Sequence, residues 1–93
     1  LEARLQAILK GHTWLFTAHC PEIDVKATGL NIYSRLEERE ILKSELRLYL
    51  GYTSAEAIYR WSEGKNLPTL QNLYAISRIV GVSINDLLVT VSP

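Results

Sequence analysis

Apolar residues recur every three or four positions along most of this chain, which is the spacing of one face of a helix. The first run of this kind ends at Gly11 and carries Leu1, Leu5, Ile8 and Leu9. Residues 12–23 follow, with the apolar group Trp14-Leu15-Phe16, and fit a short helix as well as an extended segment. The pattern predicts an N-terminal helix and leaves the following segment open.

The next two helices have clear signals at their ends. Asp24 is a good N-cap for a helix from Val25 to about Arg39, whose spacing buries Ala27 or Leu30, together with Ile32 and Leu36. A second helix is expected from Lys43 to Leu50, with Leu46 and Leu50 inward and Gly51 supplying the turn. The connection Glu40-Ile41-Leu42-Lys43 contains no glycine and no hydroxyl cap, so we expect an unusual turn there.

Three more helices complete the pattern. One runs from Ser54 to about Glu63, with Thr53 or Ser54 as its cap. Another follows the cap residue Thr69 and stops at Gly81; it carries Leu70, Leu73, Tyr74, Ile76 and Val80. Ser83 and Asp86 have the spacing of a capping box and begin a short helix ending near Val89. The predicted fold class is all-α, with five helices in residues 24–90 and one or two in front.

The helix at residues 54–63 has two distinct faces at 100° per residue. Ala57, Ile58 and Trp61 share the arc that should pack on the core. The opposite arc carries Ala55, Glu56, Tyr59, Arg60 and Glu63. The pattern therefore predicts a short amphipathic helix with a polar, outward face.

Residues 50–68 read Leu-Gly-Tyr-Thr-Ser-Ala-Glu-Ala-Ile-Tyr-Arg-Trp-Ser-Glu-Gly-Lys-Asn-Leu-Pro. This stretch resembles the Cro/repressor-like (xenobiotic-response-element type) helix-turn-helix family, and the likeness extends over residues 46–89. The resemblance implies a compact five-helix lambda-repressor-like domain at residues 24–93. It also implies a sequence-specific DNA-binding transcriptional regulator, most simply a repressor, that reads the major groove with helix 54–63.

The resemblance also implies which residues meet DNA. Arg60 could pair with guanine or neutralise a phosphate, and Glu56 could accept from cytosine N4. Lys65 and Asn66, with Ser54, could hold phosphate oxygens, and Lys43 and Arg47 would lie near the DNA backbone. The full set of expected DNA-binding residues is Lys43, Arg47, Thr53, Ser54, Ala55, Glu56, Tyr59, Arg60, Lys65 and Asn66.

A single recognition helix contacts few base pairs, so a homodimer on a two-fold operator of double-stranded DNA is expected. Residues 1–23 form a separate N-terminal helical extension in this interpretation. Its apolar residues, Trp14 and Phe16 among them, fit either a dimer surface or a cap on the core of the same chain.

The charge balance keeps a second function open. The chain has 10 basic and 10 acidic residues, whereas DNA-binding domains usually carry a basic excess. Glu56 and Glu63 would place two carboxylates near phosphates. The alternative is a protein-binding module on the same scaffold, such as a phage-encoded inhibitor of a host defence protein, with aromatic anchors at Trp14, Tyr52 and Tyr59.

Other functional classes find little support in the sequence. The single cysteine, Cys20, fits a reducing, cytoplasmic setting, and no apolar run approaches the length of a membrane span. His12 and the adjacent pair His19-Cys20 lack the further ligands that zinc requires. Adjacency also disfavours a nucleophilic pair. We therefore expect no enzymatic activity, no metal and no cofactor.

Overall fold

The computed structural model describes residues 21–91, and these fold into five helices: α3 (Val25–Glu38), α4 (Lys43–Leu50), α5 (Glu56–Ser62), α6 (Leu70–Val80) and α7 (Ile84–Leu87). Within residues 21–91 there is no strand, only an isolated antiparallel bridge between Ile23 and Thr90. The all-α class is confirmed. The helix expected in residues 1–11 and most of the predicted N-terminal extension lie outside the described residues, so the division of the chain at residue 23 stays a prediction.

The helix starts follow their polar caps. The Asp24 carboxylate accepts a hydrogen bond from the Ala27 amide at 3.0 Å. The Thr69 hydroxyl accepts from the amide of Asn72 at 3.2 Å, and Ser83 accepts from the amide of Asp86 at 3.1 Å. Each cap satisfies an amide that has no partner within its own helix. The predictions for these three caps are confirmed.

Four of the helices end in the same hydrogen-bonded turn, in which one residue adopts the left-handed conformation. Glycine fills that position at Gly51, Gly64 and Gly81, with φ of 78°, 74° and 75°. At the end of α3 the position is Glu40, with φ of 56°. The turn is closed there by the amide of Ile41, which donates to the carbonyl of Leu36 at 2.9 Å. This six-to-one bond is that of a Schellman motif, which glycine normally completes.

The unusual connection after α3 thus has a simple explanation: a glutamate takes the place of the glycine. The hydroxyl cap that is missing from α4 is replaced as well. Leu42 is the N-cap of α4, and the amide of Leu42 donates a hydrogen bond to the Glu45 carboxylate at 2.9 Å.

Two predicted boundaries are wrong. Helix α5 begins at Glu56, two residues later than expected, and its N-cap is Ala55 rather than Thr53 or Ser54. The Ser54 hydroxyl does accept from the amide of Glu56, at 3.4 Å, but it lies in the turn before the helix. Helix α7 ends at Leu87, because Leu88 is extended, with φ −78° and ψ 135°.

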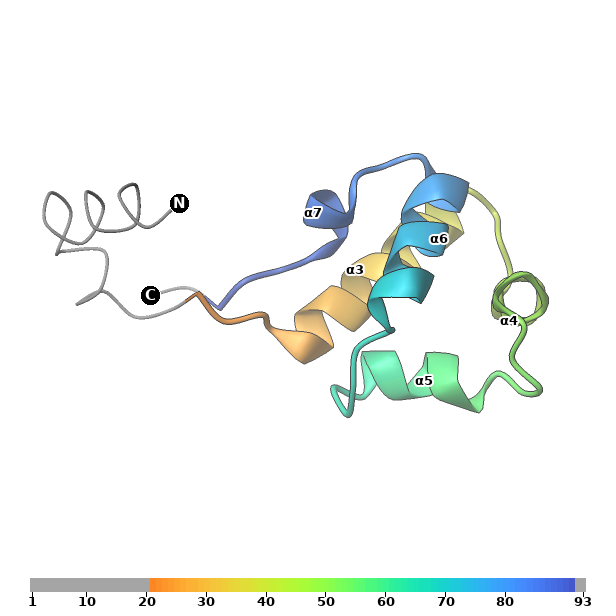
Figure 1. The fold of residues 1–93 in the computed structure, drawn as a ribbon, viewed down its shortest axis with the longest axis horizontal. Helices are drawn as coiled ribbons and strands as arrows, with labels where there is room; N and C mark the ends of the chain where they lie inside the picture. The colour runs from red at the N-terminus through yellow and green to blue at the C-terminus, as the bar shows by residue number, and fades with distance from the viewer. Residues whose placement is uncertain (1–20, 92–93) are drawn as a thin grey trace, which may run out of the picture.

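The ends of the described segment lie side by side (Figure 1). The amide of Asp24 donates to the carbonyl of Val89 at 2.7 Å, and the amide of Val91 donates to the carbonyl of Glu22 at 2.8 Å. The buried hydroxyl of Thr28 accepts from the amide of Val89 at 2.9 Å. Residues 22–24 and 89–91 therefore form a short antiparallel neck beside the start of α3.

The core lies between α3, α5 and α6, with α4 and α7 closing it from either side (Figure 1). Its buried side chains are Ile32, Leu36, Leu46, Ile58, Trp61, Leu73, Ile76, Val80 and Leu87. Leu50 packs against this cluster while partly exposed. Of the two alternatives predicted for the inward face, Ala27 is half-buried and Leu30 is 50% exposed; Thr28 and Gly29 are the buried residues there instead.

Gly29 is the point where α3 and α5 touch. A Cβ placed on Gly29 would lie 2.0 Å from the carbonyl oxygen of Trp61 and 2.9 Å from the amide nitrogen of Ser62. No side chain fits in that space, so the two helix backbones meet directly. This contact fixes where α5 sits, and so where its outer face is presented.

Candidate nucleic-acid interface

Helix α5 divides sharply into a buried and an exposed side. Ile58 and Trp61 are 0% and 1% exposed, whereas Tyr59 is 50% exposed, and Glu56 and Arg60 are also exposed. The two faces are therefore arranged as predicted except at Ala55 and Ala57. Ala55 was expected on the outer face but is half-buried and precedes the helix as its N-cap. Ala57 was expected in the core but is only half-buried, and it lies at the edge of a surface hollow.

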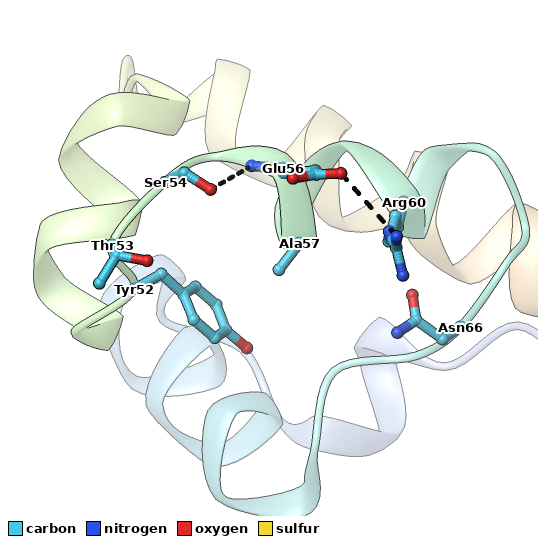
Figure 2. Close-up of a pocket in the computed structure, with 7 residues that line it drawn as sticks. All are labelled: Tyr52, Thr53, Ser54, Glu56, Ala57, Arg60 and Asn66. Atoms are coloured by element: carbon cyan, nitrogen blue, oxygen red, sulfur yellow. Dashed lines mark hydrogen bonds and ion pairs between the residues drawn. The ribbon is translucent and has the colours of Figure 1, made fainter.

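The hollow has a volume of about 260 Å³ and lies between α5 and the loop that leads to α6. Figure 2 shows Ala57 pointing into it from the helix, with Tyr52 on one side and Arg60 and Asn66 on the other. Its lining consists of Tyr52, Thr53, Ser54, Glu56, Ala57, Arg60 and Asn66. The structure thus gathers five of the predicted DNA-binding residues around one open hollow.

Tyr52 is held firmly at the edge of this hollow. Its ring meets Trp61 edge-on, with centroids 6.4 Å apart and ring planes at 63°, a favourable aromatic geometry. The side-chain amide of Asn72 donates a hydrogen bond to the Tyr52 hydroxyl. Tyr52 was not among the predicted DNA-binding residues. The sequence did show an aromatic residue directly after Gly51. It could not show that Asn72 on α6 would hold the hydroxyl of this residue in place.

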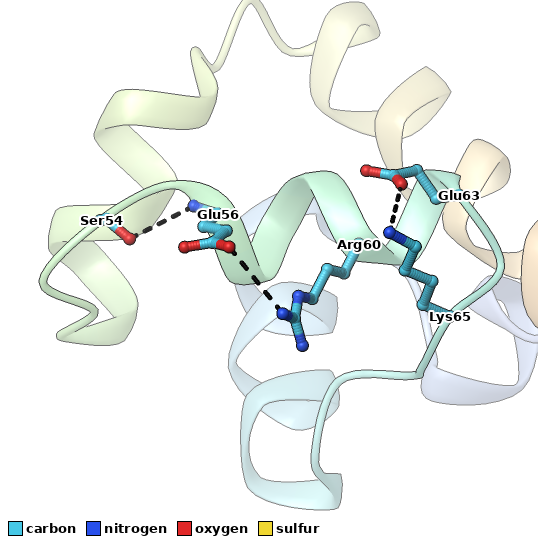
Figure 3. A network of polar contacts seen from close by, with 5 residues as sticks. All are labelled: Ser54, Glu56, Arg60, Glu63 and Lys65. Carbon is cyan, nitrogen blue, oxygen red and sulfur yellow. Dashed lines mark hydrogen bonds and ion pairs between the residues drawn. The ribbon is translucent and has the colours of Figure 1, made fainter.

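Each carboxylate on the outer side of α5 has a cationic neighbour (Figure 3). Glu56 and Arg60, one turn apart, approach to 3.8 Å. Glu63 and Lys65 form a closer pair at 2.9 Å. All four side chains are at least half exposed, so both pairs are weak. The two cations partly neutralise the carboxylates near the predicted path of the DNA phosphates. The carboxylates in turn partly neutralise the cations that would bind those phosphates.

Arg47, at the end of α4, is bound to the turn that precedes α5. Its Nη1 donates to the backbone carbonyls of Tyr52 at 3.0 Å and Thr53 at 3.3 Å. The guanidinium therefore bridges α4 to the turn before α5. These bonds satisfy two backbone carbonyls that lie outside the helices and tie residues 52–53 to α4.

Lys43 lies at the start of α4, with its ammonium 4.3 Å from the centroid of the Tyr33 ring and 5.7 Å from that of Tyr59. Both distances are within the range of a cation–π interaction. The Tyr33 hydroxyl donates to the carbonyl of Ile58. Burial raises the pKa of Tyr33 above its ordinary value, so this phenol stays a donor. Lys43 therefore lies between Tyr33 on α3 and Tyr59 on α5 and supports the Tyr59 ring.

The remaining predicted residues are distributed around these groups. Ala55 is the half-buried N-cap of α5, and Lys65 is exposed beside Glu63. Between residues 21 and 91, no group of three or more His, Cys, Asp or Glu side chains is placed to hold a metal ion. His12, His19 and Cys20 lie outside the described residues. None of the helices described is long and apolar enough to cross a membrane.

Comparison with known proteins gives a likeness of fold alone. No protein-family model matches the chain, and neither does any curated protein. Among solved structures, cobalt(II) HppE in complex with substrate and apo-HppE each align at 24% sequence identity and a TM-score of 0.62. Both alignments cover 71% of this chain and 36% of the HppE chain. The chain therefore spans about a third of the length of these structures.

Proposed function

We propose that the described helices form the DNA-reading part of a sequence-specific transcriptional regulator, a repressor that binds double-stranded DNA as a homodimer. The observation that carries the proposal is the outer face of α5. It is a short helix whose inner side is anchored by Ile58 and Trp61 and whose outer side presents a carboxylate, a phenol and a guanidinium. A major groove accepts a helix of this width and is read by such groups.

The surroundings of α5 support the same function. Thr53, Ser54 and Asn66 supply exposed hydroxyls and an amide beside the helix, which are typical partners of phosphate and sugar oxygens. Arg47 and Lys43 belong to the support of α5 in this proposal: Arg47 fixes the preceding turn, and Lys43 stacks on Tyr59. Arg60 is the expected reader of a base, because its guanidinium reaches the open hollow (Figure 2).

The proposal assigns no catalysis to these residues. HppE binds a substrate, and the likeness covers 36% of that chain. The polar groups around the hollow lie in open solvent, with Glu56 and Arg60 side chains 76% and 52% exposed. Electrostatic catalysis depends on groups preorganised in a site from which water is excluded. An exposed polar face of this kind is suited to binding.

A protein-binding role is the second candidate, and one observation favours it. Several large apolar side chains are more than half exposed, among them Leu48 and Tyr49 on α4 and Leu70 and Tyr74 on α6. Exposed aromatic and aliphatic side chains serve as anchors in protein interfaces. An inhibitor of a host defence protein could use them on the same scaffold.

The test is selection of binding sites from random duplex DNA, followed by titration of the best site at two salt concentrations. A regulator should select a two-fold sequence, and its affinity should fall steeply as salt rises. Arg60→Ala should lose discrimination among sequences while its circular dichroism matches the parent. Arg78→Ala is the matched control, since Arg78 is an exposed arginine in the last turn of α6. Absence of any selected sequence at low salt would favour the protein-binding role.

A further inference from the structure

The ion pair between Glu56 and Arg60 lies at the centre of the outer face of α5. Glu56 is in the first turn and Arg60 follows one turn later, so the two side chains point the same way (Figure 3). Their charged groups are 3.8 Å apart. The Glu56 carboxylate, a strong hydrogen-bond acceptor, therefore lies beside the N–H donors of the Arg60 guanidinium.

Both members keep most of their bonding capacity. An ionised carboxylate has about four acceptor positions and a guanidinium has five N–H donors. The pair is exposed and of the i, i+4 kind, which contributes only weakly to helix stability. It therefore orients the two groups without committing their remaining donors and acceptors.

From these contacts we infer that the Glu56–Arg60 pair reads a cytosine–guanine base pair, with Glu56 as the specificity-determining residue. Guanine presents O6 and N7 as two adjacent acceptors, and its partner cytosine presents the N4 amino donor beside them. Arg60 donates to the two guanine acceptors, and Glu56 accepts from cytosine N4. The inference rests on the proposed DNA-binding function and adds the base pair that is chosen.

An adenine–thymine pair does not fit the same two groups. Adenine offers one acceptor, N7, next to the N6 donor, and thymine offers a single acceptor beside a methyl group. The guanidinium would lose one of its two bonds. Phosphate is excluded as the partner of Glu56 by charge, so a base amino group is the donor that the carboxylate can meet in the groove.

The test changes the carboxylate to its uncharged isostere. Sites are selected from random duplex DNA with the full chain and with Glu56→Gln, and each selected site is then titrated with both proteins. Glutamine pairs with adenine N6 and N7, so the preference at one position in each half-site should move from cytosine to adenine. The expected change in relative affinity at that position is about tenfold or more, with the other positions unchanged.

The control removes the same charge elsewhere. Glu38→Gln lies at the end of α3 and is exposed, and it should select the parent's sequence. A parent that selects a site with cytosine–guanine at this position and a Glu56→Gln variant that selects adenine support the inference. If Glu56→Gln selects the parent's site unchanged, the inference is wrong while the DNA-binding function stands. If the parent selects no sequence at all, both are wrong.

Discussion

The crossing of α3 and α5 at Gly29 gives a prediction whose size follows from the geometry. In Gly29→Ala the added Cβ would begin 2.0 Å from the carbonyl oxygen of Trp61, and an ordinary contact begins at 3.4 Å. The α5 backbone must therefore withdraw by about 1.4 Å, because the obstructing atoms are backbone and cannot rotate away. That movement also draws Ile58 and Trp61 away from the core.

Two opposing effects set the magnitude. Overpacking of a close-packed interior costs about 1–3 kcal/mol and sometimes more, and a backbone clash of this depth belongs at the upper end. Alanine regains about 1 kcal/mol of helix propensity over glycine. We expect a net loss of roughly 2–3 kcal/mol, against a total stability of about 4–10 kcal/mol for a domain of this size. The melting temperature should fall by about 10–20 °C.

The measurement is urea and thermal unfolding followed by circular dichroism. Gly51→Ala is the matched control. Gly51 has φ of 78° and nothing within 4 Å of an added Cβ, so it should lose only the conformational cost of about 1–2 kcal/mol. A Gly29→Ala protein as stable as the parent would refute the direct backbone contact. Some other contact would then have to fix the position of α5.

Two further predictions concern α3 and its end. Glu40→Gly should raise the free energy of unfolding by about 0.5–1 kcal/mol, because glycine adopts φ of 56° without steric strain; lower stability in urea would contradict a left-handed Glu40. Tyr33 should make stability depend on pH above about 10. Its folded pKa is raised by burial, so the contribution is complete below the unfolded pKa and is lost as pH rises towards the folded value. Urea midpoints between pH 8 and 11 should show a smaller alkaline decline in Tyr33→Phe, and equal declines would exclude Tyr33 as the source.

Helix ends were the part of the fold most open to prediction from the sequence. Asp24, Thr69 and Ser83 were identified correctly because a cap is a local device, in which a side chain bonds to an amide two or three residues ahead. The glycine stops at Gly51 and Gly81 follow from the same local chemistry.

The start of α5 could not be predicted in this way. Thr53 and Ser54 have the composition of caps, yet the turn runs on to Ala55. Arg47 binds the carbonyls of residues 52 and 53 from the preceding helix, and that contact keeps them out of the helix. Local cap propensity was overridden by two side-chain hydrogen bonds from the preceding helix.

The inward face of α3 was missed for a related reason. Ala27 or Leu30 was expected to face the core, but Thr28 lies there instead, because its hydroxyl accepts a hydrogen bond from the amide of Val89, far away in the sequence. Gly29 is required by the backbone of another helix. For the candidate site, the sequence identified the residues of α5, whereas the hollow between α5 and Asn66 depends on the packing of Tyr52 on Trp61.

The neck formed by residues 22–24 and 89–91 has a mechanical consequence. Tension that pulls residues 21 and 91 apart acts on two antiparallel segments at their open end. The neck has two backbone hydrogen bonds, Val91 to Glu22 and Asp24 to Val89. This tension loads them one after the other. After the neck opens, the bond from the amide of Val89 to the Thr28 hydroxyl carries the load next, followed by the bonds from the Asn31 side chain to the carbonyls of Asp86 and Leu87. The domain should therefore unzip from its ends at lower force than a domain in which tension shears all such bonds at once.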